Sequence, residues 1–108
     1  MQFDVDMISE HKDLFIAARK LLLSHNEISE TKKPRITTYG TKSGGVCHMR
    51  TMPHGIDFGF LKGVKLDDPQ GLLSGKGKTL RVLSLKTLDV ERVEYFIKQA
   101  IALNESAR

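Results

Sequence analysis

The sequence is short of the residues and runs that mark secreted and membrane proteins. Its 108 residues include a single cysteine, Cys47, so no intramolecular disulfide is possible and nothing indicates an oxidising compartment. The N-terminus is acidic and lacks the basic start and apolar run of a signal peptide, and no apolar stretch approaches the length of a membrane span. We therefore expect a cytoplasmic protein with no membrane attachment.

The basic residues form no polybasic tract. Seventeen Lys and Arg against thirteen Asp and Glu give a formal charge of +4, a mild excess that favours anionic partners without specifying one. The positive residues are spread along the chain and are locally dense only at residues 31–35 and 76–81. This distribution argues against nucleic acid as the main partner.

No repeat or low-complexity segment divides the chain. Its length is that of one domain, and 40% hydrophobic with 28% charged residues is close to the globular average. We expect residues 1–108 to fold as a single domain, either as a monomer or as a small homo-oligomer.

Apolar residues at helical spacing predict a helix at each end of the chain. The first covers residues 6–25, with Asp4 or Asp6 capping its start and Asn26 in a left-handed conformation at its end. The second begins at a cap on Thr87 or Asp89 and runs to about residue 104. Their apolar faces contain Met7, His11, Leu14, Phe15, Ala18, Leu21 and Leu22 in the first, and Val90, Val93, Phe96, Ile97, Ala100 and Ile101 in the second.

Between the helices, alternating patterns predict several short strands. Residues 27–35 have no period and are interpreted as a loop, and the glycine-rich residues 40–45 as a turn without the pattern of a phosphate-binding loop. The predicted strands are residues 36–39, 46–52, 56–61 and 80–85.

The middle two strands are predicted to form a hairpin closed by His54 and Gly55. With a two-residue loop, Thr51 lies opposite Phe58 and Met49 opposite Phe60. One face then collects the apolar residues, including Cys47 as a small core residue, and the other collects His48, Arg50 and Asp57. That second face is interpreted either as a solvated surface with a cross-strand ion pair or as a site that binds an anion or moves a proton.

The connection at residues 62–79 is long and carries a glycine- and lysine-rich tip, Gly75-Lys76-Gly77-Lys78, named here the Gly/Lys loop. Glycines let backbone N–H groups approach a ligand closely, and the cations nearby favour a phosphate or a carboxylate. A surface loop without a ligand is the alternative interpretation. The candidate ligand-binding residues are Gly75, Lys76, Gly77, Lys78, Arg81, Arg50 and His48.

The order of elements predicts an α+β fold, a two-layer sandwich in which about five antiparallel strands are covered on one face by the two helices. Its centre is expected to contain Leu14, Phe15, Leu22, Phe58, Phe60, Leu83, Val93 and Ile97.

The runs IDFGF (56–60), GVKLDDP (63–69), LLSGKGK (72–78) and RVL (81–83) resemble the YdhG-like domain of unknown function, over roughly residues 39–102. The resemblance implies a small cytoplasmic protein with a frataxin-like arrangement of two helices on an antiparallel sheet. Some relatives are described as iron chaperones, and frataxins use an acidic ridge for iron. The corresponding residues here would be Asp4, Asp6, Glu10 and Asp13.

Three hypotheses follow from different classes. The first is a non-enzymatic binding module for a small anionic ligand or an acidic partner, acting through the Gly/Lys loop. The second is a frataxin-like iron chaperone, with iron as the only cofactor considered. The third is a small enzyme using His48, Arg50 and Asp57, for which no nucleophile–base pair is visible in the sequence.

Overall fold

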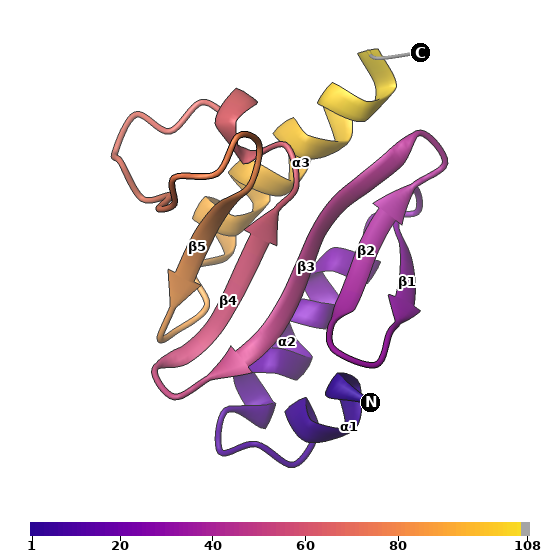
Figure 1. Cartoon of the computed structure of the whole chain (residues 1–108), viewed down its shortest axis with the longest axis vertical. Helices are drawn as coiled ribbons and strands as arrows, with labels where there is room; N and C mark the ends of the chain where they lie inside the picture. The colour runs from indigo at the N-terminus through magenta and orange to yellow at the C-terminus, as the bar shows by residue number, and fades with distance from the viewer. Residues whose placement is uncertain (107–108) are drawn as a thin grey trace.

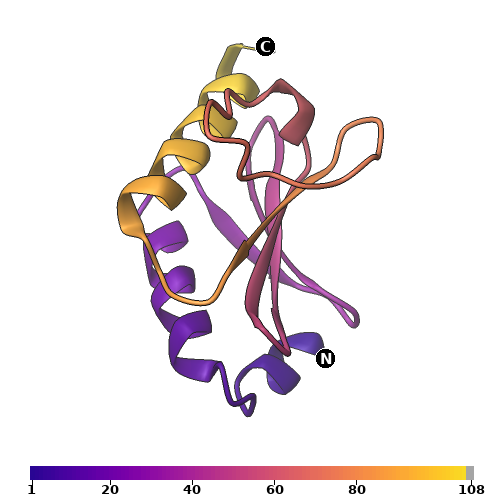
Figure 2. The same ribbon diagram turned by 90° about the vertical axis from the view of Figure 1, so that its left-hand side faces the viewer.

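In a computed structural model, which describes residues 1–106, the chain is an α+β sandwich (Figure 1). Five antiparallel strands form one sheet whose spatial order follows the chain order. Figure 2 shows the two long helices, α2 (Lys12–Leu23) and α3 (Val90–Ser106), on one side of this sheet, and neither of them covers its other face. The elements are α1 (Gln2–Asp6), α2 (Lys12–Leu23), β1 (Ser29–Lys32), β2 (Thr37–Thr41), β3 (Gly44–Met52), β4 (Gly55–Phe60), the 3₁₀ turn η1 (Gly63–Lys65), β5 (Arg81–Leu85) and α3 (Val90–Ser106). The predicted fold class is confirmed.

The core lies between the sheet and the two long helices. Phe15, Ala18 and Leu22 of α2 belong to one buried cluster with the inward side chains of β3, β4 and β5. Of the residues predicted for the centre, all are buried except Leu14, which is partly exposed. No helix within residues 1–106 is both long enough and apolar enough to cross a membrane.

The predicted first helix is interrupted. Asp6 ends α1 with its side chain turned inward, where Oδ1 accepts hydrogen bonds from the Thr51 backbone N–H at 3.0 Å and hydroxyl at 2.7 Å. A turn follows in which Ser9 Oγ accepts the backbone N–H of His11, and α2 begins after His11. The prediction of one continuous helix was therefore wrong. The hydrogen bonds of Asp6 to Thr51 on β3 and of His11 to the Ser9 hydroxyl compete with the hydrogen bonds of a continuous helix. At the far end of α2 no non-glycine residue has positive φ, so Asn26 is not left-handed.

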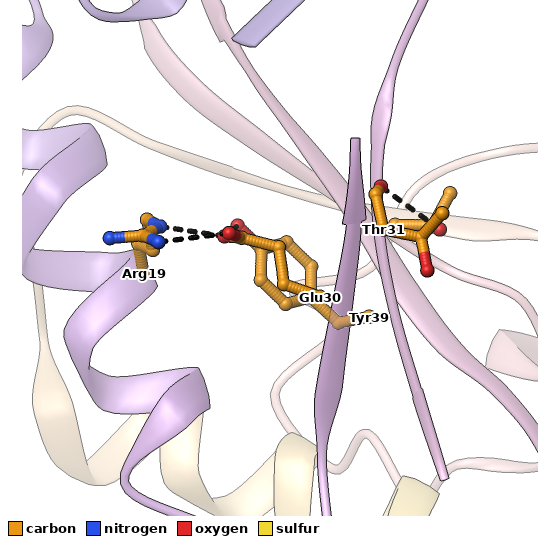
Figure 3. A network of polar contacts seen from close by, with 5 residues as sticks. Arg19, Glu30, Thr31 and Tyr39 are labelled. Carbon is orange, nitrogen blue, oxygen red and sulfur yellow. Dashed lines mark hydrogen bonds and ion pairs between the residues drawn. The ribbon is translucent and has the colours of Figure 1, made fainter. Parts of the chain in front are cut away.

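The segment predicted as a loop, residues 27–35, contains β1, which pairs with β2. Glu30 of β1 points toward α2, where Arg19 Nε and Nη2 donate to its carboxylate at 2.6 and 2.9 Å and the Tyr39 hydroxyl donates at 2.9 Å (Figure 3). Lys32, on the same side, places its Nζ 3.9 Å from the centre of the Phe3 ring. A polar strand is stable here because its inward-facing charges find partners on α1, α2 and β2.

The hairpin of β3 and β4 has the predicted faces but a register shifted by two residues. Met49 lies opposite Phe58 and Thr51 opposite Ile56, so the loop residues are Pro53 and His54 rather than His54 and Gly55. Proline fixes φ and has no N–H to donate, which suits a turn position better than a strand. Gly55 is instead the first residue of β4, with a φ of +148° and with its α-carbon against the Leu85 carbonyl, where a side chain would clash.

The final helix starts as predicted at Asp89. The Asp89 carbonyl accepts the N–H of Val93 at 3.1 Å, and its carboxylate accepts the N–H of Arg92 at 3.3 Å. Val90 does not belong to the buried stripe, since the residue is 49% exposed at the first position of the helix.

Candidate functional site

The sheet face without helices, named here the helix-free face, carries a row of small residues around one histidine. Successive pairings place Thr31, Thr38, His48, Gly59 and Val82 side by side across all five strands. Ser74 extends this row by one position, because its N–H and carbonyl pair with those of Val82. The row forms a shallow floor on which His48 is the largest side chain.

His48 lies directly over Gly59. A Cβ at Gly59 would collide with three atoms of the imidazole ring, so the ring occupies the space left free by the missing side chain. The pKa of His48 is lowered, first by burial and then by the charge of Arg50. No hydrogen bond to either ring nitrogen occurs within residues 1–106, so a neutral imidazole presents one donor and one acceptor on this face.

Arg50 and Asp57 lie on the same face, as predicted, and the observed register makes them direct cross-strand neighbours, which the predicted register did not. The predicted ion pair between them is not formed in the described part of the chain. Instead, Asp57 Oδ1 lies 2.7 Å from His54 Nε2 and accepts the Ser84 hydroxyl at 2.7 Å. Arg50 is exposed and its charge is left without a carboxylate partner among the described residues.

The Gly/Lys loop projects from the side of the sheet that carries no helix (Figure 2). Arg81 shapes it, because its Nη1 donates to the carbonyls of Gly77 and Leu80, both at 2.7 Å. Gly75 has a φ of +132°, a conformation that favours glycine. Lys76 and Lys78 are exposed, and within residues 1–106 neither makes an ion pair or a side-chain hydrogen bond.

The structure does not bring the candidate residues together in one pocket. His48 and Arg50 lie on the helix-free face and the Gly/Lys loop projects from that side, whereas Arg81 lies opposite Phe60, in register with the inward-facing residues of the sheet. Arg81 is the first residue of β5 and lies next to the loop. Val82 follows it in the row of His48, and Ser84 lies in the row of Arg50. The two lysines and Arg50 are therefore at opposite ends of the helix-free face, with His48 between them. Such spacing suits an extended anionic partner better than a single small anion.

A hollow of about 420 Å³ lies beside this row at the β1–β2–β3 end of the sheet. Its lining includes Thr31, Thr38 and three glycines, together with Lys33 and Leu61. Lys33, His54 and Ser84 were missed as site residues by the sequence analysis. Only the strand pairing, which the sequence does not state, brings these three to the helix-free face.

The acidic residues proposed for iron do not gather. Asp6 is fully buried against Thr51, and Asp4 makes an ion pair with the N-terminal amine at 3.2 Å. Glu10 lies in the turn after α1, and Asp13 lies in α2. Across the described residues no three His, Cys, Asp or Glu side chains come together as a metal site.

Cys47 is fully buried on the helix side of β3, and burial raises the pKa of its thiol. Since the thiolate is the reactive form of cysteine, this residue is packed as a small apolar side chain, as predicted.

No protein family, curated protein or solved structure matches this chain. The resemblance to the YdhG-like domain therefore stays a prediction.

Proposed function

We propose that this chain is a non-enzymatic binding module whose helix-free face receives an acidic segment of another protein. The observation that carries the proposal is the uneven placement of charge on that face. Arg50, Lys76 and Lys78 are exposed there without carboxylate partners, and Asp57, the one acidic strand residue facing that side within residues 1–106, already accepts two hydrogen bonds. Their charges favour an anionic partner.

The row of small residues supports an extended partner. Gly59 and the two threonines leave the centre of the face low, so a chain laid across it can reach the free ring nitrogens of His48. An acidic segment would run from Arg50, past His48, to the Gly/Lys loop. At the loop, backbone N–H groups and the two lysines can bind its carboxylates.

Nucleic acid is the less suitable anionic partner. Single-stranded nucleic acids bind on aromatic side chains that stack with their bases. Phe58, Phe60 and Tyr39 point to the opposite, buried side, and no Phe, Tyr or Trp of a strand faces the helix-free side in the described chain. A protein segment needs charge and hydrogen bonds but no stacking. This proposal keeps the cytoplasmic location that the sequence predicts.

Poly-L-glutamate is a direct probe for the proposal. In a backbone amide NMR titration of the full chain, we expect shifts at His48, Gly59, Val82 and residues 75–78. The affinity should fall steeply with added salt because the charges are exposed. Replacing Arg50, Lys76 and Lys78 with alanine should weaken binding about tenfold or more.

The matched control removes three exposed charges from the helix side, with alanine at Lys12, Lys20 and Lys98. If this control weakens binding as much as the first variant, the attraction is unspecific and the proposed face is wrong. Inorganic phosphate is titrated in parallel. Tight phosphate binding at residues 75–78 without any response to poly-L-glutamate would replace the acidic partner with a small anionic ligand.

A further inference from the structure

The connection between β4 and β5 borders a second concave site, which is separate from the Gly/Lys loop and lies against α3. It is a cavity of about 320 Å³ between residues 68–72 and the first two turns of α3. Pro69, Gln70 and Leu72 form one wall, and Arg92, Tyr95 and Phe96 form the other. Figure 2 shows this part of the connection passing close to α3 before the chain turns back toward the helix-free face. The volume is at the lower end of the range for small-molecule sites, so only a small ligand fits.

The loop wall is fixed by its own hydrogen bonds. The two carboxylate oxygens of Asp68 accept the N–H groups of Leu72 and Leu73 at 2.8 and 2.9 Å. The side chain of Gln99, on α3, accepts the N–H of Asp67 at 2.7 Å and donates to its carbonyl at 3.1 Å. Because these bonds attach the loop to the helix that forms the opposite wall, the cavity is formed before any ligand arrives.

The helix wall is aromatic. Phe96 is buried, and the ring of Tyr95 meets it edge-to-face with 5.4 Å between the ring centres. Tyr95 is nevertheless 45% exposed, which is high for a tyrosine in contact with the core. Together with Leu72 and Pro69, these rings form an apolar slot that suits a flat, aromatic molecule.

The charged side chains that line the cavity determine which polar group a bound aromatic molecule can carry. Arg92 is half exposed, and its one ion pair within residues 1–106 is to Asp89, at 3.4 Å, which leaves most of the guanidinium free to bind. Both oxygens of Asp68 are occupied by backbone N–H groups. Glu91 also lines the cavity, and its carboxylate repels a ligand with two negative charges about twice as strongly as a ligand with one.

We propose that this cavity binds a small aromatic monocarboxylate, with its ring against Tyr95 and Phe96 and its carboxylate on the Arg92 guanidinium. A guanidinium binds a carboxylate through parallel N–H donors, which fixes the orientation of the ligand as well as holding its charge. The site is independent of the proposed function, since it shares none of Arg50, His48, Lys76 and Lys78.

The test compares 2-naphthoate with neutral 2-naphthamide and cationic 2-naphthylmethylamine by amide NMR titration. We expect 2-naphthoate to bind most tightly, with shifts at Leu72, Arg92 and Tyr95. Arg92→Gln should weaken 2-naphthoate about tenfold and leave 2-naphthamide nearly unchanged. Tyr95→Ala, at an exposed side chain, should weaken both compounds.

Lys98→Gln is the matched control, because it removes a charge from an exposed position of the same helix and should leave binding unchanged. Equal loss of 2-naphthoate in Lys98→Gln and Arg92→Gln would overturn the proposal, as would tighter binding of the amine or an absence of shifts around the cavity. The variant with alanine at Arg50, Lys76 and Lys78 should bind 2-naphthoate like the unmodified protein, so failure of one proposal leaves the other standing.

Discussion

The imidazole of His48 on β3 occupies the space above Gly59 on β4 that a side chain at that position would fill. This contact depends on one strand pairing, and it places a histidine at the centre of the helix-free face, which neither α2 nor α3 covers. Because the glycine has no Cβ, the ring can lie low against the sheet, where burial and the charge of Arg50 keep it neutral.

Gly59→Ala tests this contact. The new methyl group has to displace the ring, and overpacking of this kind destabilises a protein by about 1–3 kcal/mol. Urea unfolding should show the loss for Gly59→Ala and a recovery of most of it in the double variant Gly59→Ala/His48→Ala. If the double variant is no more stable than Gly59→Ala alone, the two residues are not in contact.

His48 should make anion binding depend on pH. Its pKa in the free protein lies below the ordinary 6.5, and a bound carboxylate would raise it by stabilising the charged ring. Binding is then coupled to proton uptake, so affinity for poly-L-glutamate should increase as the pH falls from about 7.5 to about 5.5, where glutamate remains mostly ionised. His48→Gln should bind with a flatter pH profile. An equal rise in affinity in both proteins would place the titrating group elsewhere.

The sequence predicts the two faces of the β3–β4 hairpin but not its register. The two faces of the β3–β4 hairpin follow from strict alternation, so His48 and Arg50 were correctly placed together opposite Cys47 and Met49. A shift of two residues keeps the same faces, and alternation therefore could not give the register that puts His48 over Gly59. The proline at position 53 was the signal for the correct turn.

Strand β1 was missed for a different reason. Its sequence, SETK, is polar on both sides, and strand patterns are recognised by an apolar face. The partners that allow Glu30 and Lys32 to face inward are Arg19 on α2, Phe3 on α1 and Tyr39 on β2. These contacts exist only once the chain has folded, so no local pattern could reveal them.

Glu30→Gln tests the network that holds β1. Burial alone would raise the pKa of this carboxyl, but hydrogen bonds from Arg19 and Tyr39 outweigh it and leave the pKa below its ordinary value of 4.5. The stability that the charged form contributes is fully present above about pH 4.5 and is lost as the pH falls through the lower pKa of the folded state.

We expect Glu30→Gln to lower the free energy of unfolding at neutral pH by about 1.5–3 kcal/mol, the range for hydrogen bonds to charged groups. The difference from the unmodified protein should shrink in acid, as shown by urea unfolding at both pH values. Glu27→Gln, at an exposed position just before β1, is the control and should have little effect. A difference that stays constant with pH would mean that the charge of Glu30 contributes nothing.

Arg81 separates the shape of the Gly/Lys loop from its charge. Its guanidinium donates to two carbonyls four and one residues earlier, Gly77 and Leu80, and a lysine amine cannot reproduce that planar geometry. Arg81→Lys keeps the charge, so it should leave the salt dependence of anion binding in place while amide hydrogen exchange at residues 75–80 becomes faster.

Lys78→Ala, which removes a charge without a structural partner in the described chain, should weaken binding but leave exchange unchanged. Because the loop lies outside the core, neither variant should change the free energy of unfolding by more than about 1 kcal/mol. Unchanged exchange in Arg81→Lys would show that the loop is held by its glycine backbone alone.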